Sequence, residues 1–167
     1  MALAGSAGAD VSPTQRALAR ELFQQGRALM AKKDYVKACA KLAESQRIDP
    51  ATGTLLNLAV CHEAEGKTAS AWAEFNDALS LSRQDGRKDR VELATKHIAN
   101  LEPRLSRLTI DVPPDARVAG LEIKLDDGRV GRTAWGTAVP VDPGTHTVRA
   151  LAAGWKEWQT EITVGAD

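Results

Sequence analysis

The chain has 167 residues, and 22 basic side chains balance 22 acidic ones, so its formal net charge is zero. Hydrophobic residues make up 43% of the sequence, which is enough for a core and argues against wholesale disorder. A dedicated nucleic-acid-binding protein normally carries excess positive charge to neutralise phosphates, so the charge balance argues against that class. No apolar run approaches the ~20 residues that a membrane-spanning helix needs, so we expect no direct membrane span.

Residues 1–11 are rich in alanine and glycine and predict a flexible tail. They lack both a basic start and an apolar stretch, so they are not an intact signal peptide. The run Ala2-Leu3-Ala4 nevertheless has the small-x-small pattern found at the end of one. Two interpretations stay open, namely the remnant of a cleaved export signal and an ordinary flexible tail.

Apolar residues recur at three- and four-residue steps from Ser12 to about Pro103, which is the period of a helix. Ser12 is expected to N-cap the first helix, with Pro13 at its first position and Gln15 closing a capping box. Four more helices are expected, over residues 34–49, from Thr52 or Thr54 to Gly66, over residues 68–83 and over residues 87–102.

After about Arg107 the apolar period becomes two, which is typical of strands. The alternating runs are Leu108-Ile110-Val112, Leu121-Ile123-Leu125 and Ile162-Val164, and turn sequences such as Asp126-Asp127-Gly128 separate them. The sequence therefore predicts an α+β chain of two domains, with a helical domain over residues 12–104 and a small antiparallel β-sandwich over residues 105–167.

The helical segment repeats itself. The small residue of one helix moves from Gly26 to Ala59, and an alanine of the next helix moves from Ala38 to Ala71, each by 33 residues. This helix-turn-helix pattern resembles the tetratricopeptide repeat (TPR), whose period is about 34 residues. The resemblance implies two repeats and a capping fifth helix, with Gly26, Ala59 and Ala94 at the close helix contacts.

Longer stretches carry a more specific resemblance. They are Ala38-Cys39-x2-Leu42-x2-Ser45-x2-Ile48-Asp49-Pro50, then Gly53-Thr54-Leu55-Leu56-Asn57-Leu58-Ala59-x-Cys61-His62-Glu63-x2-Gly66-Lys67, Ala71-Trp72-x2-Phe75 and Leu101-Glu102-Pro103-Arg104-Leu105. These stretches resemble small TPR proteins of myxobacteria and their relatives. Such segments occur in exported proteins and beside serine/threonine kinase domains, although no kinase motif is present in this chain.

The strand-rich half carries a second resemblance. The residues are Leu108-Thr109-Ile110, Ile123-x-Leu125-Asp126-Asp127-Gly128, Val141-x2-Gly144-x-His146-x-Val148 and Ala153-Gly154-Trp155. They resemble the PEGA domain, a small sandwich of bacterial envelope proteins. The tetrapeptide that names the domain is absent, and Ala134-Trp135-Gly136-Thr137 stands where the family carries a small residue and proline.

The histidines and cysteines do not form a metal-binding motif. His62 and His97 occupy the same position in successive repeats, where a TPR packs an aromatic ring, and Cys61 must point about 100° away from His62 on a helix. No C-x2-C or H-x3-H spacing occurs, and no G-x-S-x-G indicates a nucleophile. We therefore expect a noncatalytic protein with no metal and no cofactor.

Cys39 and Cys61 fall on neighbouring, antiparallel helices of the expected stack, one early and the other late in its helix. This placement makes a disulfide geometrically plausible in an oxidising compartment. Two small buried thiols are the alternative.

Two surfaces are candidate binding sites. The concave face of a TPR array is lined by the first helix of each repeat. The residues on that face that do not occupy core positions of the repeat form a candidate peptide groove: Phe23, Arg27, Met30, Leu56, Asn57, Val60, Lys88 and Val91. Asn57 falls where carboxylate-clamp TPRs carry an asparagine, but Phe23 and Arg27 do not match the other clamp positions. In an array this short, the fifth helix is also able to fill part of the groove.

The second surface is an aromatic patch of Trp135, Trp155 and Trp158, able to bind a glycan or a protein partner. Trp155 and Trp158 are three residues apart, so in a strand they face opposite sides and one belongs to the core. Ordinary packing is the alternative for the whole set.

These features predict a noncatalytic protein–protein interaction adaptor or scaffold of the bacterial cell envelope, in the periplasm or otherwise extracytoplasmic. Its expected partner is a protein or peptide, with envelope glycan as a second candidate and nucleic acid excluded. The alternative is an extracytoplasmic sensor or accessory region of a serine/threonine kinase signalling system.

Overall fold

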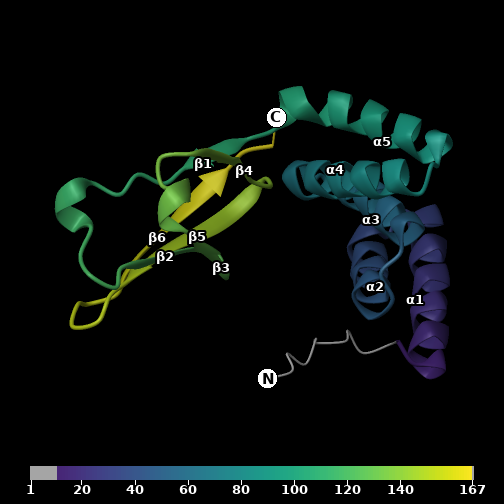
Figure 1. Cartoon of the computed structure of the whole chain (residues 1–167), viewed down its shortest axis with the longest axis horizontal. Coiled ribbons are helices and arrows are strands. Elements are labelled where there is room, and N and C mark those ends of the chain that lie inside the picture. Colours follow the sequence, from purple (N-terminus) through teal and green to yellow (C-terminus); the bar gives the residue numbers. More distant parts are fainter. Residues whose placement is uncertain (1–10, 167) are drawn as a thin grey trace, which may run out of the picture.

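The computed structural model describes residues 11–166, and ten of the eleven residues of the expected tail lie outside them. Five helices come first, namely α1 (Pro13–Ala31), α2 (Tyr35–Ile48), α3 (Thr52–Glu65), α4 (Thr68–Gln84) and α5 (Lys88–Leu101). Each helix packs against the next one along the chain, and short strands form a second lobe beside the helices (Figure 1). The α+β order is therefore confirmed.

Local chemistry starts and ends these helices where the sequence predicts. Ser12 accepts a hydrogen bond from the backbone of Gln15, whose side chain accepts one from the backbone of Ser12, so the predicted capping box is confirmed. Asp34 caps α2 by accepting from the backbone of Lys37. Gly66 ends α3 in the left-handed conformation, with φ of 90°, which glycine adopts without strain.

The helical core consists of two clusters of buried side chains. One lies between α2 and α3 and contains Ala38, Cys39, Leu42, Leu58 and Cys61. The other joins α3, α4 and α5 through Leu56, Ala59, Ala71, Phe75, Ala78, Ala94 and Leu101. The small residues predicted at close helix contacts are all buried, because a larger side chain at these points would separate the helices.

Helix α1 is fastened to α2 at two points. A Cβ atom on Gly26 would lie 2.8 Å from the Cγ atom of Leu42, so only glycine allows this approach. The hydroxyl of the buried Ser45 donates a hydrogen bond of 2.8 Å to the carbonyl of Ala19. These contacts fix the packing of the first helix pair.

The second lobe holds two antiparallel sheets. The smaller pairs β1 (Arg107–Thr109) with β4 (Ala138–Pro140). The larger contains β2 (Glu122–Leu125), β3 (Gly128–Val130), β5 (Gly144–Leu151) and β6 (Trp158–Val164), in the order β3-β2-β5-β6. Val112, Ile123 and Val148 form the buried centre of this lobe.

The first predicted strand is shorter than its alternating sequence. Strand β1 ends at Thr109, and the chain then turns through a single 3₁₀ turn over Pro114–Ala116. Its partner β4 begins at Ala138, opposite Thr109, and Gly136 just before β4 has a φ of 78°, so the residues after Thr109 have no strand to pair with. Val112 is still buried, as the alternation predicts, but it packs from a loop.

The two lobes are joined by a short connection and by hydrogen bonds to the side chain of Asp142. A 3₁₀ turn over Glu102–Arg104 follows α5, and β1 begins three residues later at Arg107. Across the junction, Asp142 accepts hydrogen bonds from the backbone N–H groups of Ala69 and Ser70, at 2.8 and 2.9 Å. Among residues 11–166, no helix is both long and apolar enough to cross a membrane.

Candidate binding cleft

A cavity of about 540 Å³ opens on one face of the four-stranded sheet. Alternate residues of neighbouring strands form its floor, namely Ile123 of β2, Val148 and Ala150 of β5, and Thr160 and Ile162 of β6. They share a face because side chains alternate across a strand. The opposite wall is the segment between β1 and β2, which contributes Ile110, Val112, Pro113, Ala116 and Val118. Volume and apolar lining are typical of a ligand cleft.

Two tryptophans stand at the edge of this cleft. Trp155 is 67% exposed and Trp158 is 55% exposed, although both line the cavity. The prediction that one of the two belongs to the core is wrong. Trp155 lies in the turn between β5 and β6, so the alternation of a strand does not apply to it.

Trp135 does not join the other two tryptophans. It packs against the buried cluster of the lobe, and its indole N–H donates to the carbonyl of Val130 at 3.3 Å. The guanidinium of Arg132 lies over its ring, 5.6 Å from the centroid. The predicted aromatic patch is thus reduced to Trp155 and Trp158, and Trp135 takes the packing role that was its alternative.

Charged side chains border the apolar interior of the cleft. Asp111 and Asp115 come from the wall segment, and Lys156 lies between the two tryptophans in sequence. All three are exposed. An apolar centre with a charged rim is the usual anatomy of a surface that binds another protein.

Strand β6 forms an edge beside the cleft. Within the described part of the chain, it pairs with β5 alone over its seven residues. One side of its backbone therefore has free N–H and C=O groups, which can pair with an extended segment of another chain. The cleft and the free edge lie on the same strand, because Trp158, Thr160 and Ile162 belong to both.

The residues of the candidate peptide groove on the helices do not form one open surface. Leu56 is only 5% exposed and belongs to the core, and Val60 packs against the same cluster. Phe23 and Met30 pack against the other cluster. Asn57 uses its amide to donate to the carbonyl of Gly53 at 2.8 Å, within its own helix.

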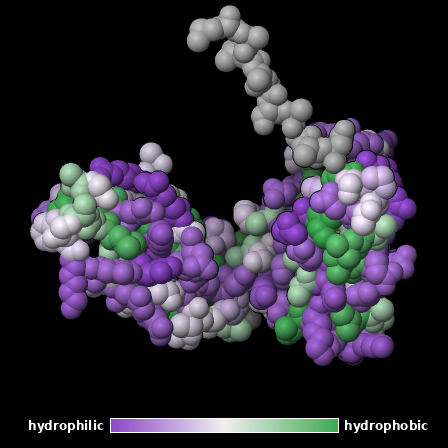
Figure 2. Space-filling model, turned by 90° about the horizontal axis from the view of Figure 1, so that it is seen from below, coloured by the Kyte–Doolittle hydropathy of each residue, from purple (hydrophilic) through white to green (hydrophobic). Residues whose placement is uncertain are grey.

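The remaining groove residues are polar or lie apart. Arg27 is exposed and lies over the ring of Phe23, with 5.9 Å to the centroid, and Lys88 is exposed at the start of α5. Val91 is half-buried. The prediction that Leu56 and Val60 of α3 line an open groove is therefore wrong, because neighbouring helices cover these two side chains. Apolar surface on both lobes is visible in Figure 2.

A disulfide joins Cys39 of α2 to Cys61 of α3, and their Cα atoms are 5.6 Å apart. Both residues are buried, with 3% and 0% exposure. Of the two alternatives that the sequence leaves open, the structure has the bonded pair.

The histidines of the helical half are paired with carboxylates. His62 Nδ1 lies 3.0 and 2.9 Å from the two carboxylate oxygens of Glu74, and His97 Nδ1 contacts Glu63. The ring of His97 also stacks on Phe75, with centroids 4.5 Å apart. The packing role predicted for His97 agrees with this contact, but the contacts with carboxylates were not predicted.

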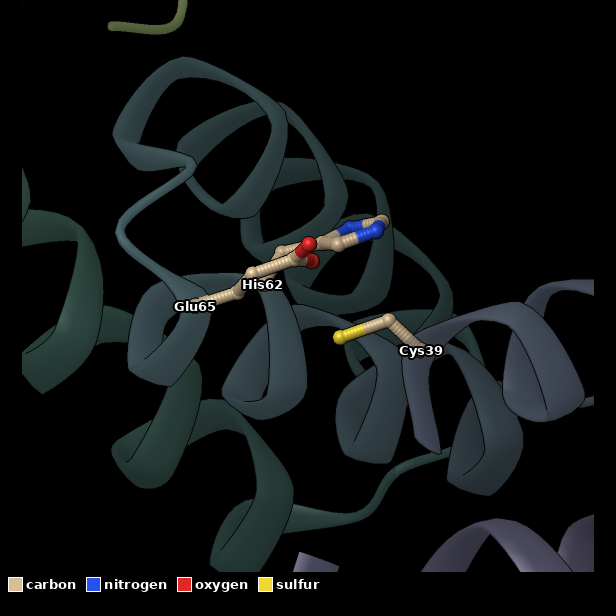
Figure 3. A group of neighbouring side chains, drawn as sticks. All are labelled: Cys39, His62 and Glu65. Atoms are coloured by element: carbon tan, nitrogen blue, oxygen red, sulfur yellow. The ribbon is translucent and has the colours of Figure 1, made fainter. Parts of the chain in front are cut away.

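The structure also brings Cys39, His62 and Glu65 together, which sequence reasoning missed. One potential ligand atom of each lies within 4.8 Å of the others, and Figure 3 shows the three side chains side by side. His62 and Glu65 are three residues apart and share a face of α3. This spacing was the available signal, but the approach of Cys39 depends on how α2 packs.

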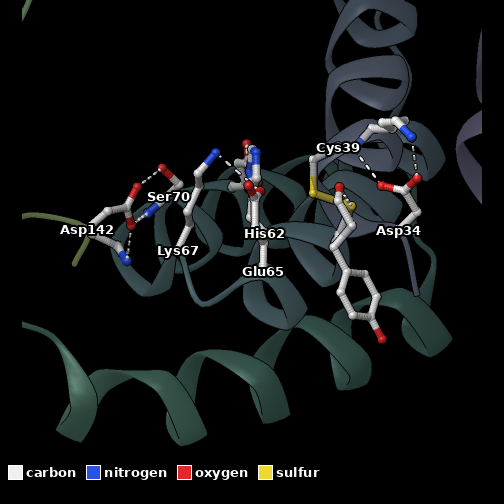
Figure 4. Close-up of polar contacts among 12 residues, drawn as sticks. Asp34, Cys39, His62, Glu65, Lys67, Ser70 and Asp142 are labelled. Carbon is white, nitrogen blue, oxygen red and sulfur yellow. Dashed lines mark hydrogen bonds and ion pairs between the residues drawn. A yellow bond between two sulfur atoms is a disulfide. The ribbon is translucent and has the colours of Figure 1, made fainter. Parts of the chain in front are cut away.

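A second polar cluster lies at the junction of the lobes. His146 Nδ1 lies 2.8 Å from Asp126 Oδ2, and its Nε2 lies 2.7 Å from the carbonyl of Asp142. The Asp126 carboxylate raises the pKa of His146 above its ordinary value, and the Asp142 carbonyl adds to the effect. In return, hydrogen bonds from His146 and from the backbone of Thr147 lower the pKa of Asp126. Through its contact with the carbonyl of Asp142, His146 orients the residue whose carboxylate caps α4. Figure 4 shows Asp142 beside Ser70.

No protein-family model, curated protein or solved structure matches this chain.

Proposed function

We propose that this chain is a noncatalytic interaction module that binds an extended, apolar segment of a protein partner in the cleft of its second lobe. The observation that carries the proposal is the cavity of about 540 Å³ with Trp155 and Trp158 exposed at its edge. Large exposed aromatic side chains lose apolar hydration on binding and commonly dominate the affinity of an interface.

The free edge of β6 supports the choice of an extended protein segment. Such a segment would pair with the β6 backbone and place every second side chain over the apolar floor. Asp111 and Asp115 on one wall favour a segment with a basic residue beside its apolar ones.

We further propose that the helical half is a TPR array of two repeats and a capping helix, and that the two sheets form a PEGA-like sandwich. Burial of Gly26, Ala59 and Ala94 at equivalent positions supports the first part. In this arrangement the helices are a rigid support, because their predicted groove is largely filled.

An extracytoplasmic location, at the bacterial cell envelope, completes the proposal. The Cys39–Cys61 disulfide supports it, because disulfides persist in oxidising compartments and are rare in the reducing cytosol.

Photo-crosslinking of the full chain tests the binding surface. A photoreactive phenylalanine derivative replaces Trp155 at the cleft or, as the control, Val36, which is 69% exposed on α2. We expect one dominant crosslinked protein in native envelopes from position 155, lost when Trp158→Ala is added, and no such product from position 36. Identical products from both positions, or none from position 155, would contradict the proposal.

A further inference from the structure

A cluster of potential metal ligands lies in the helical half, far along the chain from the cleft. It contains Cys39 on α2 with His62 and Glu65 on α3. The three come close to one another in the narrow space where the two helices pack (Figure 3). A thiolate, an imidazole and a carboxylate are the ligand types that Zn²⁺ prefers in proteins.

His62 is already oriented for coordination. Glu74 on α4 contacts Nδ1 through both carboxylate oxygens, and the tautomer that donates Nδ1–H to Glu74 leaves Nε2 for a metal. A carboxylate bonded to the second ring nitrogen is the usual partner of a metal-binding histidine, since it fixes the tautomer and raises the basicity of the ligand.

Glu65 has a carboxylate oxygen that the fold leaves unsatisfied. Its Oε2 atom is buried and makes no hydrogen bond within the described residues. The only cation beside it there is Lys67 Nζ, at 3.2 Å, in an ion pair that is not aligned for a hydrogen bond. The side chain of Lys67 is 45% exposed, so it can turn into solvent and release the carboxylate. Figure 4 shows this pair beside His62.

The disulfide withholds the third ligand. Cys39 Sγ is bonded to Cys61 and offers no thiolate in this state. After reduction, the thiol of Cys61 has a partner of its own, because the carbonyl of Tyr35 lies 3.5 Å from its sulfur. Cys39 Sγ is then free to rotate about its Cα–Cβ bond toward His62 and Glu65.

We propose that opening the Cys39–Cys61 disulfide creates a Zn²⁺ site formed by Cys39 Sγ, His62 Nε2 and the Glu65 carboxylate. One potential ligand atom of each residue now lies within 4.8 Å of the others, and these distances must shorten for a metal to be bound. Bond lengths of about 2.0–2.3 Å put tetrahedral ligands about 3.3–3.6 Å apart. Side-chain rotation of Cys39 and Glu65 covers that difference, and water takes the fourth position.

A phosphine can serve as the reductant that opens the Cys39–Cys61 disulfide. The phosphine gives two electrons to the disulfide and takes the oxygen of one water, and that water supplies the protons of the two thiols. Zn²⁺ then displaces the proton of the Cys39 thiol into solvent as the Zn–S bond forms. In the reverse direction, exchange with an added small-molecule disulfide re-forms Cys39–Cys61, and the added disulfide takes up the two electrons and two protons as its two thiols. Cys39 then no longer offers a thiolate to the metal.

Titration of the full chain with Co²⁺, a spectroscopic substitute for Zn²⁺, tests the proposal. We expect the phosphine-reduced chain to show a thiolate-to-cobalt charge-transfer band that excess Zn²⁺ abolishes, and the oxidised chain to show none. The proposal would be overturned if the oxidised chain bound Co²⁺ equally well, or if the reduced chain showed no charge-transfer band.

Two matched variants separate the roles of the sulfurs. Both Cys61→Ser and Cys39→Ser lack the disulfide, but only Cys61→Ser keeps the proposed ligand. We expect Cys61→Ser to bind Co²⁺ without any reductant and Cys39→Ser to lose the charge-transfer band. If both variants bind alike, the site is wrong. If either fails to fold, reduced Glu65→Gln against reduced wild type decides the same question, and equal affinity overturns the site.

Two further substitutions give readouts that a merely structural role would not produce. Glu74→Gln should weaken Co²⁺ binding about 10- to 100-fold, which is the usual cost of losing an orienting partner. Lys67→Gln should strengthen binding, because it removes the cation that competes for Glu65. A weaker affinity in Lys67→Gln would contradict the assignment of Glu65 as a ligand.

Discussion

Ser70 donates its hydroxyl proton to Asp142 Oδ2, although the two residues are 72 positions apart in the sequence. The other oxygen of the same carboxylate accepts the backbone N–H groups of Ala69 and Ser70. Helix α4 has no side-chain cap of its own, because Lys67 occupies the N-cap position. Asp142 therefore supplies from the second lobe both the acceptor and the negative charge that a helix N-terminus favours.

Removing this cap should destabilise the folded chain. We expect Asp142→Ala to lower the free energy of unfolding by about 1–2 kcal/mol, the usual cost of losing an N-cap. Urea unfolding followed by circular dichroism measures the change. Asp115→Ala, which removes an exposed aspartate from the cleft rim, is the control. Equal stability of the two variants would show that the cap contributes nothing.

The His146–Asp126 pair should make stability depend on pH. Because the pKa of His146 is raised from 6.5, its contribution is present below pH 6.5 and is lost as pH rises through the raised value. Because the pKa of Asp126 is lowered from 3.8, its contribution is present above pH 3.8 and is lost as pH falls through the lowered value. The pair thus contributes fully between these two pH values.

The test compares His146→Gln with wild type across this range. The loss of unfolding free energy in the variant should be largest at about pH 5–6 and should shrink as pH rises through the raised pKa of His146, where the imidazole loses its charge. Asp126→Asn should flatten the profile in the same way. A loss that stays constant from pH 5 to 9 would mean that the charged pair does not stabilise the fold.

Any side chain at position 26 should destabilise the folded chain. In Gly26→Ala the new Cβ atom lies 2.8 Å from Leu42 Cγ and 3.2 Å from the carbonyl oxygen of Ala38, and Leu42 is fully buried. We expect a loss of about 1–3 kcal/mol, as for other overpacked cores. Gly53→Ala is the matched control, since its Cβ atom meets only Arg90 at 3.6 Å. There the better helix propensity of alanine should leave thermal stability unchanged or higher.

Loss of the disulfide should lower the free energy of unfolding. The bond closes a segment whose ends are 22 residues apart. Chain-entropy arguments assign about 3 kcal/mol to a loop of this size. Reduced wild type and Cys61→Ser should unfold at similar urea concentrations, both below oxidised wild type, and reductant should not affect the variant. A variant as stable as the oxidised chain would refute this contribution.

Local features of the fold were predictable, because the residues that cause them are near one another in sequence. The capping box at Ser12 and Gln15, the αL end at Gly66 and the change of period near Arg107 depend on neighbouring residues only. The packing of Gly26 was predictable from its repeat at Ala59. One of the two exposed tryptophans, Trp155 or Trp158, was wrongly expected in the core because the strand rule was applied across a turn.

Long-range features were not accessible in the same way. No local pattern shows that Asp142 reaches α4, or that the wall segment after β1 leaves a cleft over the sheet. The proximity of Cys39 to His62 and Glu65 depends on the register between α2 and α3, which many side chains determine together.

The disulfide has a consequence for proteolysis. It encloses the connection between α2 and α3, at Asp49–Ala51, within a covalent ring. A protease that cuts one peptide bond in that connection would leave both fragments attached to each other. The nicked molecule would keep the mass of the intact chain plus one water, and only a reductant would separate it into two bands on a gel.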